Sequence, residues 1–366
     1  MADSVPLAAA LSLAHGPAMP NRFMLAPLTN TQSNPDGTLG EDEYTWLTMR
    51  AQGGFGLTMT CAAHVQQDGQ GFPGQLGIWS DKHLAGLTRL AAGINAAGAP
   101  SAVQLQHSGR RARSDLTGLP AVCPWDDAET GARALSTGEV EQVIEDFILA
   151  ALRAETAGFN GVELHGAHGY LLGQFLDADN NHRDDRYGGS FENRTRVLLE
   201  VIAGIRDRAG ADFQLGLRLS PERFGITIAE ARALAEQVML SGRIDYLDMS
   251  LWDVFKPPIE FAEAGKPLID YFTDLPRGTT RLGVAGKIMD AARAQRCLDH
   301  GADYVLIGRG AIVHHDFPAR AIADPGFRAT PLPVSRAYLA GEGVGPAFVD
   351  YVASGMRGIV AEDAAA

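Results

Sequence analysis

The chain has 366 residues, of which 46% are hydrophobic and 20% charged, a composition typical of a folded globular protein rather than a disordered or fibrous one. Its 31 basic and 44 acidic side chains give a net charge of −13, which argues against binding to nucleic acids or anionic membrane surfaces. No apolar run is long enough to cross a bilayer, and the acidic start makes residues 7–14 a poor secretory signal.

One unit recurs along the chain: a helical pattern ends in small residues and a glycine, and a short β-rich run follows within a few positions. With three further β-rich runs, the predicted strands lie within residues 23–26, 52–60, 95–105, 157–164, 213–219, 241–249, 280–285 and 300–307. Eight such units without a Ser- or Pro-rich linker predict an α/β protein with a single-domain (β/α)8 TIM barrel. A doubly wound sheet fits less well, because Ala26-Pro-Leu-Thr29, and not a glycine-rich phosphate loop, follows the first strand.

The helix starts agree with this pattern. Ser136 with Glu139, and Thr227 with Glu230, have the spacing of capping boxes at the start of amphipathic runs. Residues 107–135 and 251–279 are too long for simple connections, so we predict lid-like loops after strands 3 and 6. We place the barrel in residues 1–330 and a C-terminal helical extension, packed on or beside it, in residues 331–366.

Three side chains that can carry chemistry follow the fourth predicted strand: His165, His168 and Tyr170. Two imidazoles can donate hydrogen bonds to one oxygen and polarise a carbonyl or nitro group, and a tyrosine can deliver a proton. The residues alone leave two alternatives open. One is that the histidines are structural loop residues, and the other is that His-x-x-His binds zinc with His182 or Asp185 as a third ligand.

Positive charge gathers at the ends of three other predicted strands. Arg218 would lie in the barrel mouth, where it needs either an anionic ligand or a structural carboxylate such as Glu163. Gly286-Lys287 and Gly308-Arg309 end the seventh and eighth strands, where many barrels bind phosphate. This cluster in an acidic chain predicts a bound phosphate group. By contrast, the charged residues 180–190 suggest Arg–Asp pairs that hold the rim.

Several motifs together resemble Old Yellow Enzyme flavoproteins over residues 7–325. They are Asn21-Arg-Phe-Met-Leu-Ala-Pro-Leu-Thr29, His165-Gly-Ala-His-Gly-Tyr-Leu-Leu-Gly-Gln-Phe175, Tyr187-Gly-Gly-Ser-Phe-Glu-Asn-Arg194, Arg218-Leu-Ser and Gly301-Ala-Asp-Tyr-Val-Leu-Ile-Gly-Arg309. The resemblance implies a barrel that holds FMN non-covalently and takes electrons from NADPH or NADH.

The resemblance also implies how the flavin is held. Thr29 would hydrogen-bond the ring near O4 and N5, Pro27 and Ala62 would give it backbone contacts, and Gln104 would bind its pyrimidine edge. Arg218 would stand near N1 and O2, where a reduced flavin carries negative charge. The remaining cofactor positions are His165 and the phosphate cradle of Gly286, Lys287, Gly308 and Arg309.

For the substrate, the resemblance implies that His165 and His168 bind its oxygen and that Tyr170 is the proton donor. Thr31 occupies a position where one subgroup has a substrate-contacting tyrosine. Cys61 stands where many relatives have a glutamate, and its role is left open.

The resemblance therefore implies an FMN-dependent NAD(P)H ene-reductase acting on a small enone or nitroalkene, with no metal, nucleic-acid or membrane partner. Its assembly would be a monomer or a homo-oligomer. The three cysteines lie far apart without a Cys-x-x-Cys motif, which favours a reducing, cytoplasmic location. The alternatives are a metal-dependent barrel lyase or hydrolase using the His-x-x-His pair, and a flavin protein that only binds or stores electrons.

Overall fold

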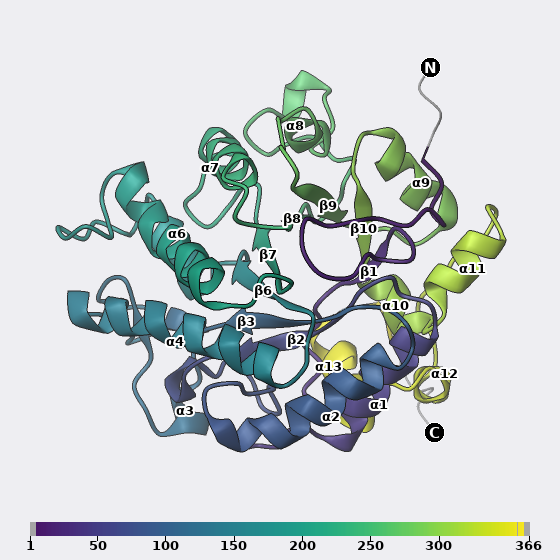
Figure 1. Ribbon diagram of the computed structural model, residues 1–366, viewed down its shortest axis with the longest axis horizontal. Coiled ribbons are helices and arrows are strands. Elements are labelled where there is room, and N and C mark those ends of the chain that lie inside the picture. The colour runs from purple at the N-terminus through teal and green to yellow at the C-terminus, as the bar shows by residue number, and fades with distance from the viewer. Residues whose placement is uncertain (1–4, 357, 362–366) are drawn as a thin grey trace.

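The computed structural model describes residues 5–356 and 358–361, in which eight parallel strands form the wall of a barrel (Figure 1). The strands are β1 (Phe23–Leu25), β2 (Thr58–His64), β3 (Ser101–Gln106), β6 (Gly161–Gly166), β7 (Gln214–Leu219), β8 (Tyr246–Ser250), β9 (Arg281–Ala285) and β10 (Tyr304–Ile307). Their order is β1-β10-β9-β8-β7-β6-β3-β2. A bridge between Met24 and Leu57 brings the two outer strands together, with Leu25 N donating to Leu57 O at 2.9 Å. The predicted (β/α)8 barrel is confirmed.

Helices cover the outside of the barrel between successive strands (Figure 1). They are α1 (Glu41–Gln52), α2 (Leu84–Asn95), α4 (Thr137–Thr156), α6 (Phe191–Arg208), α7 (Ile228–Leu240), α9 (Ala291–Asp299), α10 (Arg309–Val313) and α11 (Phe317–Ala323). The capping box that begins α4 is complete, with Ser136 and Glu139 exchanging both hydrogen bonds. At α7 only half of the expected box is present: Thr227 accepts from the Glu230 N–H at 3.2 Å, while the Glu230 carboxylate binds Arg194.

The N-terminal segment closes the end of the barrel where the strands begin. Leu11 and Met19 pair with each other and pack against the inward side chains of the strands. His15 reinforces this contact, since its Nδ1 lies 2.8 Å from the buried Asp245 carboxylate. The opposite end, where the strands finish, is left for the site.

Two tyrosines fill the barrel interior because glycines face them. Tyr246 and Tyr304 are fully buried, and their rings lie 6.2 Å apart edge to face. A Cβ added at Gly216 would come 2.1 Å from the ring of Tyr246, and one at Gly283 would come 2.2 Å from that of Tyr304. The two glycines therefore make the space that the aromatic layer occupies.

We expect Gly283→Ala to destabilise the protein by about 1–3 kcal/mol, because the methyl group overpacks a closed interior. Gly341→Ala is the matched control, since a Cβ there meets no atom within 4 Å. Denaturant unfolding of the two variants measures the difference. Equal midpoints for both would show that Tyr304 moves aside without cost.

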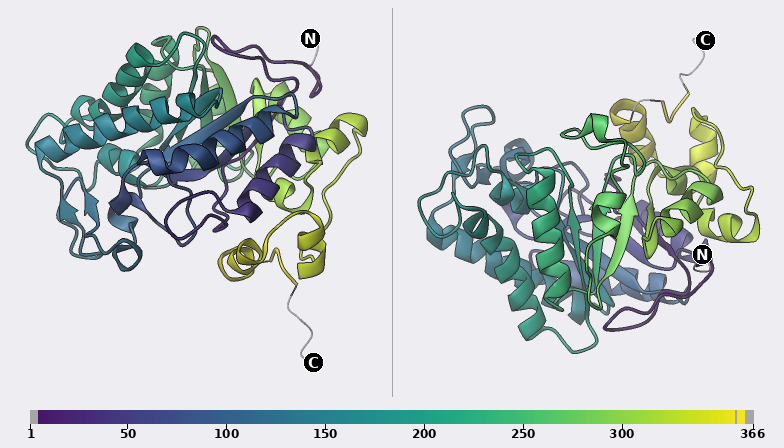
Figure 2. Two further views of the ribbon diagram at one scale, coloured as in Figure 1. Left: turned by 60° about the horizontal axis from the view of Figure 1, so that its bottom comes forward. Right: turned by 90° about the horizontal axis from the view of Figure 1, so that it is seen from above.

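The two long connections have short elements of their own. Residues 107–135 contain η3 (Gly109–Arg111), α3 (Ser114–Thr117), β4 (Val122–Cys123) and β5 (Arg133–Ala134), and residues 251–279 contain η4 (Ala262–Ala264) and α8 (Asp270–Thr273). Further on lie α12 (Arg336–Gly341) and α13 (Pro346–Gly355), drawn in yellow on the side away from the purple N-terminal segment (Figure 2, left). The ring of Phe348 in α13 packs 4.9 Å from that of Trp46 in α1. The division at residue 330 stays a prediction, and parts of it (residues 1–4, 357 and 362–366) lie outside the described residues.

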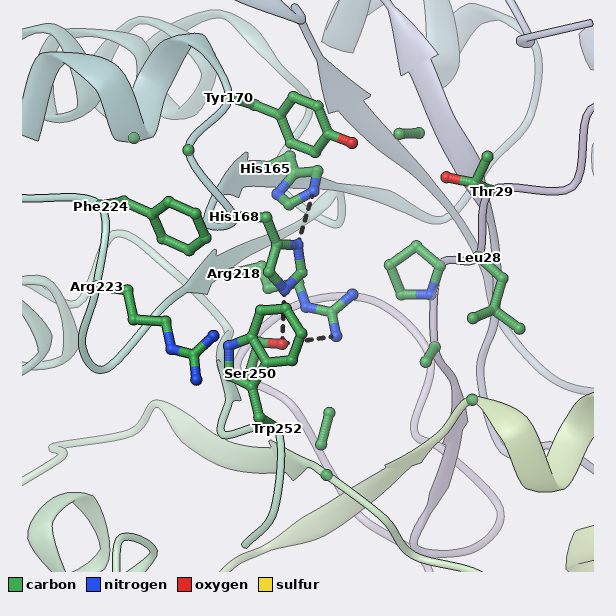
Figure 3. A pocket seen from close by; sticks show the side chains of 18 of the residues that line it. Leu28, Thr29, His165, His168, Tyr170, Arg218, Arg223, Phe224, Ser250 and Trp252 are labelled. Carbon is green, nitrogen blue, oxygen red and sulfur yellow. Dashed lines mark hydrogen bonds between the residues drawn. The ribbon is translucent and has the colours of Figure 1, made fainter. Parts of the chain in front are cut away.

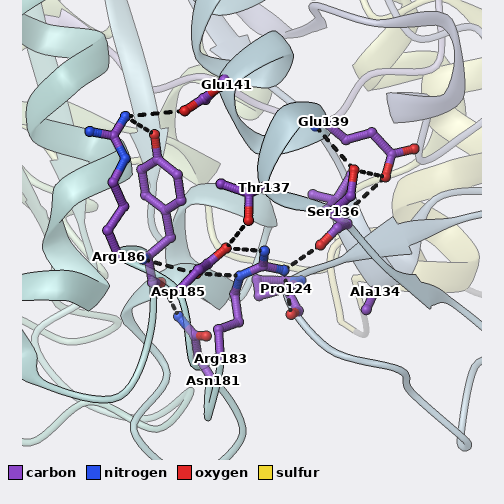
Figure 4. A network of polar contacts seen from close by, with 12 residues as sticks. Pro124, Ala134, Ser136, Thr137, Glu139, Glu141, Asn181, Arg183, Asp185 and Arg186 are labelled. Carbon is purple, nitrogen blue, oxygen red and sulfur yellow. Dashed lines mark hydrogen bonds and ion pairs between the residues drawn. The ribbon is translucent and has the colours of Figure 1, made fainter.

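The charged segment 180–190 holds two parts of the chain together at the rim (Figure 4). Arg183 binds Asp185 and donates to the carbonyl of Pro124 at 3.1 Å, while Asp185 accepts from Thr137 at 2.7 Å. These bonds connect the segment to the connection after β3 and to the start of α4. They also occupy Asp185, one of the two residues, with His182, that the zinc alternative offers as a third ligand.

No helix among residues 5–356 and 358–361 combines the length and apolar character needed to cross a membrane.

Candidate active site

A pocket of about 1630 Å³ opens where the strands end, and it brings together side chains from across the whole sequence. Every predicted site residue lines it except one; those that do are Pro27, Thr29, Ala62, Gln104, His165, His168, Tyr170, Arg218, Gly286, Lys287, Gly308 and Arg309. The exception is Thr31, whose hydroxyl donates to the carbonyl of Asn30 at 2.7 Å. The structure does not bring Thr31 to the pocket.

A short loop after β6 presents the histidines and Tyr170. His165 lies within β6, and Tyr170 is the residue before α5 (Leu171–Leu176). Between them, the backbone N–H of His168 donates to Ser220 Oγ at 2.9 Å. Gln174 then donates from Nε2 to the Gly169 carbonyl at 2.8 Å. These bonds fix the loop, so the three side chains project from a rigid support.

The rings of this loop stand in a row that faces Thr29 and Leu28 across the pocket (Figure 3). His165 lies 5.0 Å from His168 and 5.0 Å from Tyr170 between ring centroids. His165 Nε2 and His168 Nδ1 are 3.3 Å apart, and His168 Nε2 is 2.8 Å from Ser250 Oγ. A carbonyl or nitro oxygen in front of this row would meet hydrogen-bond donors and a phenol together.

Both histidines are uncharged at neutral pH. Burial lowers the pKa of His165 well below its usual value, and the charges of His168, Arg218 and Arg111 act in the same direction. Burial likewise lowers the pKa of His168 to about 3. Each neutral ring has one N–H donor and one acceptor nitrogen. The pair therefore acts by hydrogen bonding and not as a permanent cation.

Arg218 brings a buried positive charge under the row. Its Nε lies 2.7 Å from the Asp248 carboxylate, which is fully buried, and one terminal nitrogen donates to Ser250 Oγ at 3.3 Å. The carboxylate that pairs with Arg218 is thus Asp248 and not Glu163, since Glu163 Oε1 instead accepts from Gln104 Nε2 at 2.8 Å. Burial raises the pKa of Glu163, and the charge of Asp248 raises it further. The pair with Asp248 holds the Arg218 guanidinium at the wall of the pocket.

An irregularity in β2 places Ala62. The pairing of β2 with β3 shifts between Met59 and Ala62, as expected for a bulge, so that Cys61 turns into the outer core and Ala62 reaches the pocket. Burial raises the pKa of Cys61 well above its usual value, and the neighbouring Glu43 carboxyl raises it further. Cys61 is therefore a thiol in a packed core, without the features of a reactive cysteine.

The residues predicted to form a phosphate cradle lie together at the ends of β9 and β10. Lys287 Nζ lies 3.2 Å from Asp253, and Arg293, which no motif indicated, binds the same carboxylate. Arg293 Nε is buried and has no hydrogen-bond partner among the described residues. A Cβ at Gly286 would come 2.9 Å from the backbone nitrogen of Asp253, so only glycine fits there.

Residues of the C-terminal segment that no sequence motif marks complete the walls of the pocket. The C-terminal segment contributes Leu332, Gly355, Met356 and Tyr351, and the Tyr351 hydroxyl shares a hydrogen bond with Thr29. No motif marks this segment, because its helices reach the pocket only through the packing of α13 against α1.

Backbone strain collects around the same pocket. Five of its lining residues other than glycine have φ between 52° and 71°: His168, Arg223, Phe224, Trp252 and Lys287. Such conformations cost about 1–3 kcal/mol each and concentrate at functional sites. Arg223, Phe224 and Trp252 are further lining residues that the sequence did not indicate.

The residues present fit FMN. The phosphate would lie in the glycine-lined cradle, near the cations Lys287, Arg293 and Arg309. A flat ring system would lie along Pro27, Leu28 and Ala62, and Arg218 would face the edge that becomes negative on reduction. The unpartnered Nε of Arg293 is an independent sign that this end accepts an anion.

Comparison with known proteins agrees with this geometry. The sequence profile of the NADH:flavin oxidoreductase / NADH oxidase family matches residues 16–324. The chain is 35% identical over 319 residues to the probable NADH-dependent flavin oxidoreductase YqiG of Bacillus subtilis, covering 84% of this chain and 85% of that protein. It is 34% identical to the NADH:fumarate oxidoreductase of Klebsiella pneumoniae, covering 85% of this chain but only 35% of that longer protein.

Among solved structures, morphinone reductase superposes with a TM-score of 0.78 and 30% identity, covering 95% of this chain and 96% of that one. Fold, sequence and site agree, and the resemblance seen in the motifs is confirmed. This chain belongs to the NADH:flavin oxidoreductase / NADH oxidase family, the Old Yellow Enzyme family, whose members use FMN with NADH or NADPH.

Proposed function

We propose that this flavin oxidoreductase reduces the activated C=C bond of α,β-unsaturated carbonyl or nitro compounds, with NADPH or NADH as the reductant. The observation that carries the proposal is the uncharged His165–His168 pair beside the Tyr170 hydroxyl in the pocket that fits FMN. Bound FMN supplies hydride transfer from the nicotinamide to the β-carbon of the alkene. The chain's own residues supply binding, polarisation and the proton.

The histidine pair binds and polarises the substrate oxygen. Negative charge grows on that oxygen as the alkene accepts hydride, and N–H donors aimed at it stabilise this charge more than the ground state. In the structure His165 Nε2 and His168 Nδ1 contact each other, and His168 Nε2 contacts Ser250 Oγ. A substrate oxygen would replace these contacts and receive the N–H donors of the two uncharged rings. Arg218 adds positive charge on the flavin side of the pocket.

Tyr170 holds the proton that completes the reaction. The centroid of its ring lies 5.0 Å from that of His165, and the Arg111 guanidinium lies 4.5 Å over the Tyr170 ring. A phenol hydroxyl can act as a general acid, and here it would transfer its proton to the α-carbon. The resulting tyrosinate would lie next to a cation.

The zinc alternative has little support. Among the described residues no group of three or more His, Cys, Asp or Glu side chains could hold a metal ion.

The proposed alkene substrate is also in keeping with the relative named NADH:fumarate oxidoreductase, since fumarate has an activated C=C bond. We further propose a reducing, cytoplasmic location, because all three cysteines are free and buried.

The test uses the purified holoenzyme under anaerobic conditions. NADPH or NADH should bleach the yellow flavin, and 2-cyclohexenone or a nitroalkene should restore the colour and yield the saturated product. If the nicotinamides bleach the flavin but none of these alkenes restores it, the protein stores or relays electrons and the proposal is wrong.

The histidine pair also makes a prediction about pH. A histidine with its ordinary pKa of 6.5 would gain a proton as the pH falls from 7 to 5. Here the lowered pKa values keep both rings uncharged in that range, so the affinity of the oxidised holoenzyme for 2-cyclohexenone should stay constant from pH 7 to pH 5. Titration of the flavin absorbance measures it, and a step near pH 6.5 would contradict the neutral pair.

A further inference from the structure

The pocket is strongly positive although the chain is acidic overall. Seven of the residues that line it are Arg or Lys and only one is Asp, against a net charge of −13 for the chain. Four of the seven are paired with carboxylates: Arg110, Arg218, Lys287 and Arg293. In the part of the chain that the structure describes, Arg111, Arg223 and Arg309 have no carboxylate partner. Arg309 belongs to the phosphate cradle, which leaves two cations to explain.

Arg111 already has contacts within the loop of the catalytic residues. It donates to the carbonyl of His168 at 2.9 Å and lies 4.5 Å over the ring of Tyr170. The Arg223 side chain has no such polar contact with residues 5–356 or 358–361. Its guanidinium lies 5.0 Å over the exposed ring of Trp252, at the outer edge of the pocket.

Neither the acid next to Arg223 in sequence nor the acid in the pocket lining pairs with it. Glu222 is buried and binds Lys256, and it also accepts from the backbone N–H of Ile259 at 2.7 Å. The one acid in the pocket lining, Asp177, accepts from the N–H groups of Asp179 and Asn180 at 2.8 and 3.1 Å. The charge of Arg223 therefore stays available to a ligand.

The position of Arg223 relates it to the reacting atoms. The ring of Trp252 lies 6.0 Å from that of His168, so Trp252 stands between the histidine pair and Arg223 (Figure 3). Arg223 and Trp252 both have left-handed backbones, with φ of 71° and 62°, in connections that follow neighbouring strands. Two strained turns thus hold the indole ring of Trp252 and the guanidinium of Arg223 at one edge of the site.

We propose that Arg223 and Trp252 form a subsite for an anionic group, a carboxylate or a phosphate, on the molecule whose reacting end lies at His165 and His168. This inference rests on the proposed function. A guanidinium matches the two oxygens of either group, and the indole supports the apolar stem that leads to it. The anion belongs either to the tail of the alkene or to the phosphates of the nicotinamide dinucleotide.

The first test compares two alkenes with the same reacting bond, N-propylmaleimide and N-(2-carboxyethyl)maleimide, in the FMN-loaded enzyme. Arg223→Gln should raise KM for the acid about fivefold, leave its kcat unchanged and change the neutral compound less than twofold. High salt should reduce this difference, because Arg223 is exposed. Arg243→Gln is the matched control, since it removes a cation that precedes β8 at the other end of the barrel and should change neither KM.

The second test measures binding without turnover. Calorimetry with the saturated N-propylsuccinimide and N-(2-carboxyethyl)succinimide should show that Arg223→Gln lowers the affinity for the acid and not for the neutral compound. Stopped-flow reduction of the flavin by NADPH and NADH measures the affinity for the dinucleotides. If Arg223→Gln weakens this affinity fivefold and leaves KM for both maleimides unchanged, the subsite binds the dinucleotide phosphates.

The inference is overturned if Arg223→Gln weakens acid and neutral ligands equally, or if no anion is affected. Failure of the proposed function looks different. In that case wild-type enzyme would not reduce the neutral maleimide at all, whatever the succinimides show.

Discussion

Replacing Tyr170 with phenylalanine is expected to slow reoxidation of the reduced flavin by an activated alkene about 10²- to 10⁴-fold, the usual contribution of a general acid. Reduction of the flavin by NADPH or NADH should change little, because that half-reaction needs no proton from the phenol. Anaerobic stopped-flow measures the two half-reactions separately.

Tyr351→Phe is the matched control for this change. It removes a second hydroxyl from the same pocket, one that hydrogen-bonds Thr29. A proton-transfer role is specific to Tyr170, so Tyr351→Phe should affect alkene reduction far less. Equal losses in both half-reactions of Tyr170→Phe would assign Tyr170 to binding or structure and not to acid catalysis.

Removal of the Asp248 carboxylate should have the largest effect on stability. In Asp248→Ala the guanidinium of Arg218 stays buried without the carboxylate 2.7 Å from it, and we expect a loss of about 3–5 kcal/mol in the free energy of unfolding. Denaturant unfolding of the apoprotein measures this loss and avoids the contribution of bound flavin.

Two controls separate this effect from simple loss of a charge pair. Asp253→Ala breaks the partly exposed contacts with Lys287 and Arg293 and should cost about 1 kcal/mol, well below the loss in Asp248→Ala. The double variant Arg218→Met/Asp248→Leu leaves neither charge unpaired and should regain most of the stability, while it binds FMN poorly. If Asp248→Ala and Asp253→Ala cost the same, the buried pair does not have the role described here.

The order of the elements and the chemistry of the site were readable in the sequence because both depend on local patterns. Glycines after helices and short β-rich runs predicted all eight strands, and parallel strands bring their C-terminal ends to one rim. That rule alone placed His165, Arg218 and Lys287 together, although more than 100 residues separate the first from the last. The family resemblance assigned their expected roles.

Features that depend on contacts distant in sequence were decided only by the tertiary structure. The sequence suggested Glu163 as the partner of Arg218, but neighbouring strands β7 and β8 place Asp248 beside Arg218. Thr31 follows Thr29 by two residues, yet its backbone turns to φ 56° and it does not line the pocket.

The sequence by itself thus determined the barrel, the rim and the loop with His168 and Tyr170, since each follows from residue patterns within one strand and its connection. The tertiary structure decided which charges are neutralised, which are free, and that Tyr351 forms a wall of the site. The physical reason is that charge pairing, burial and the resulting pKa values depend on which side chains meet in space. The sequence of a single strand or helix does not specify which distant residues will contact it.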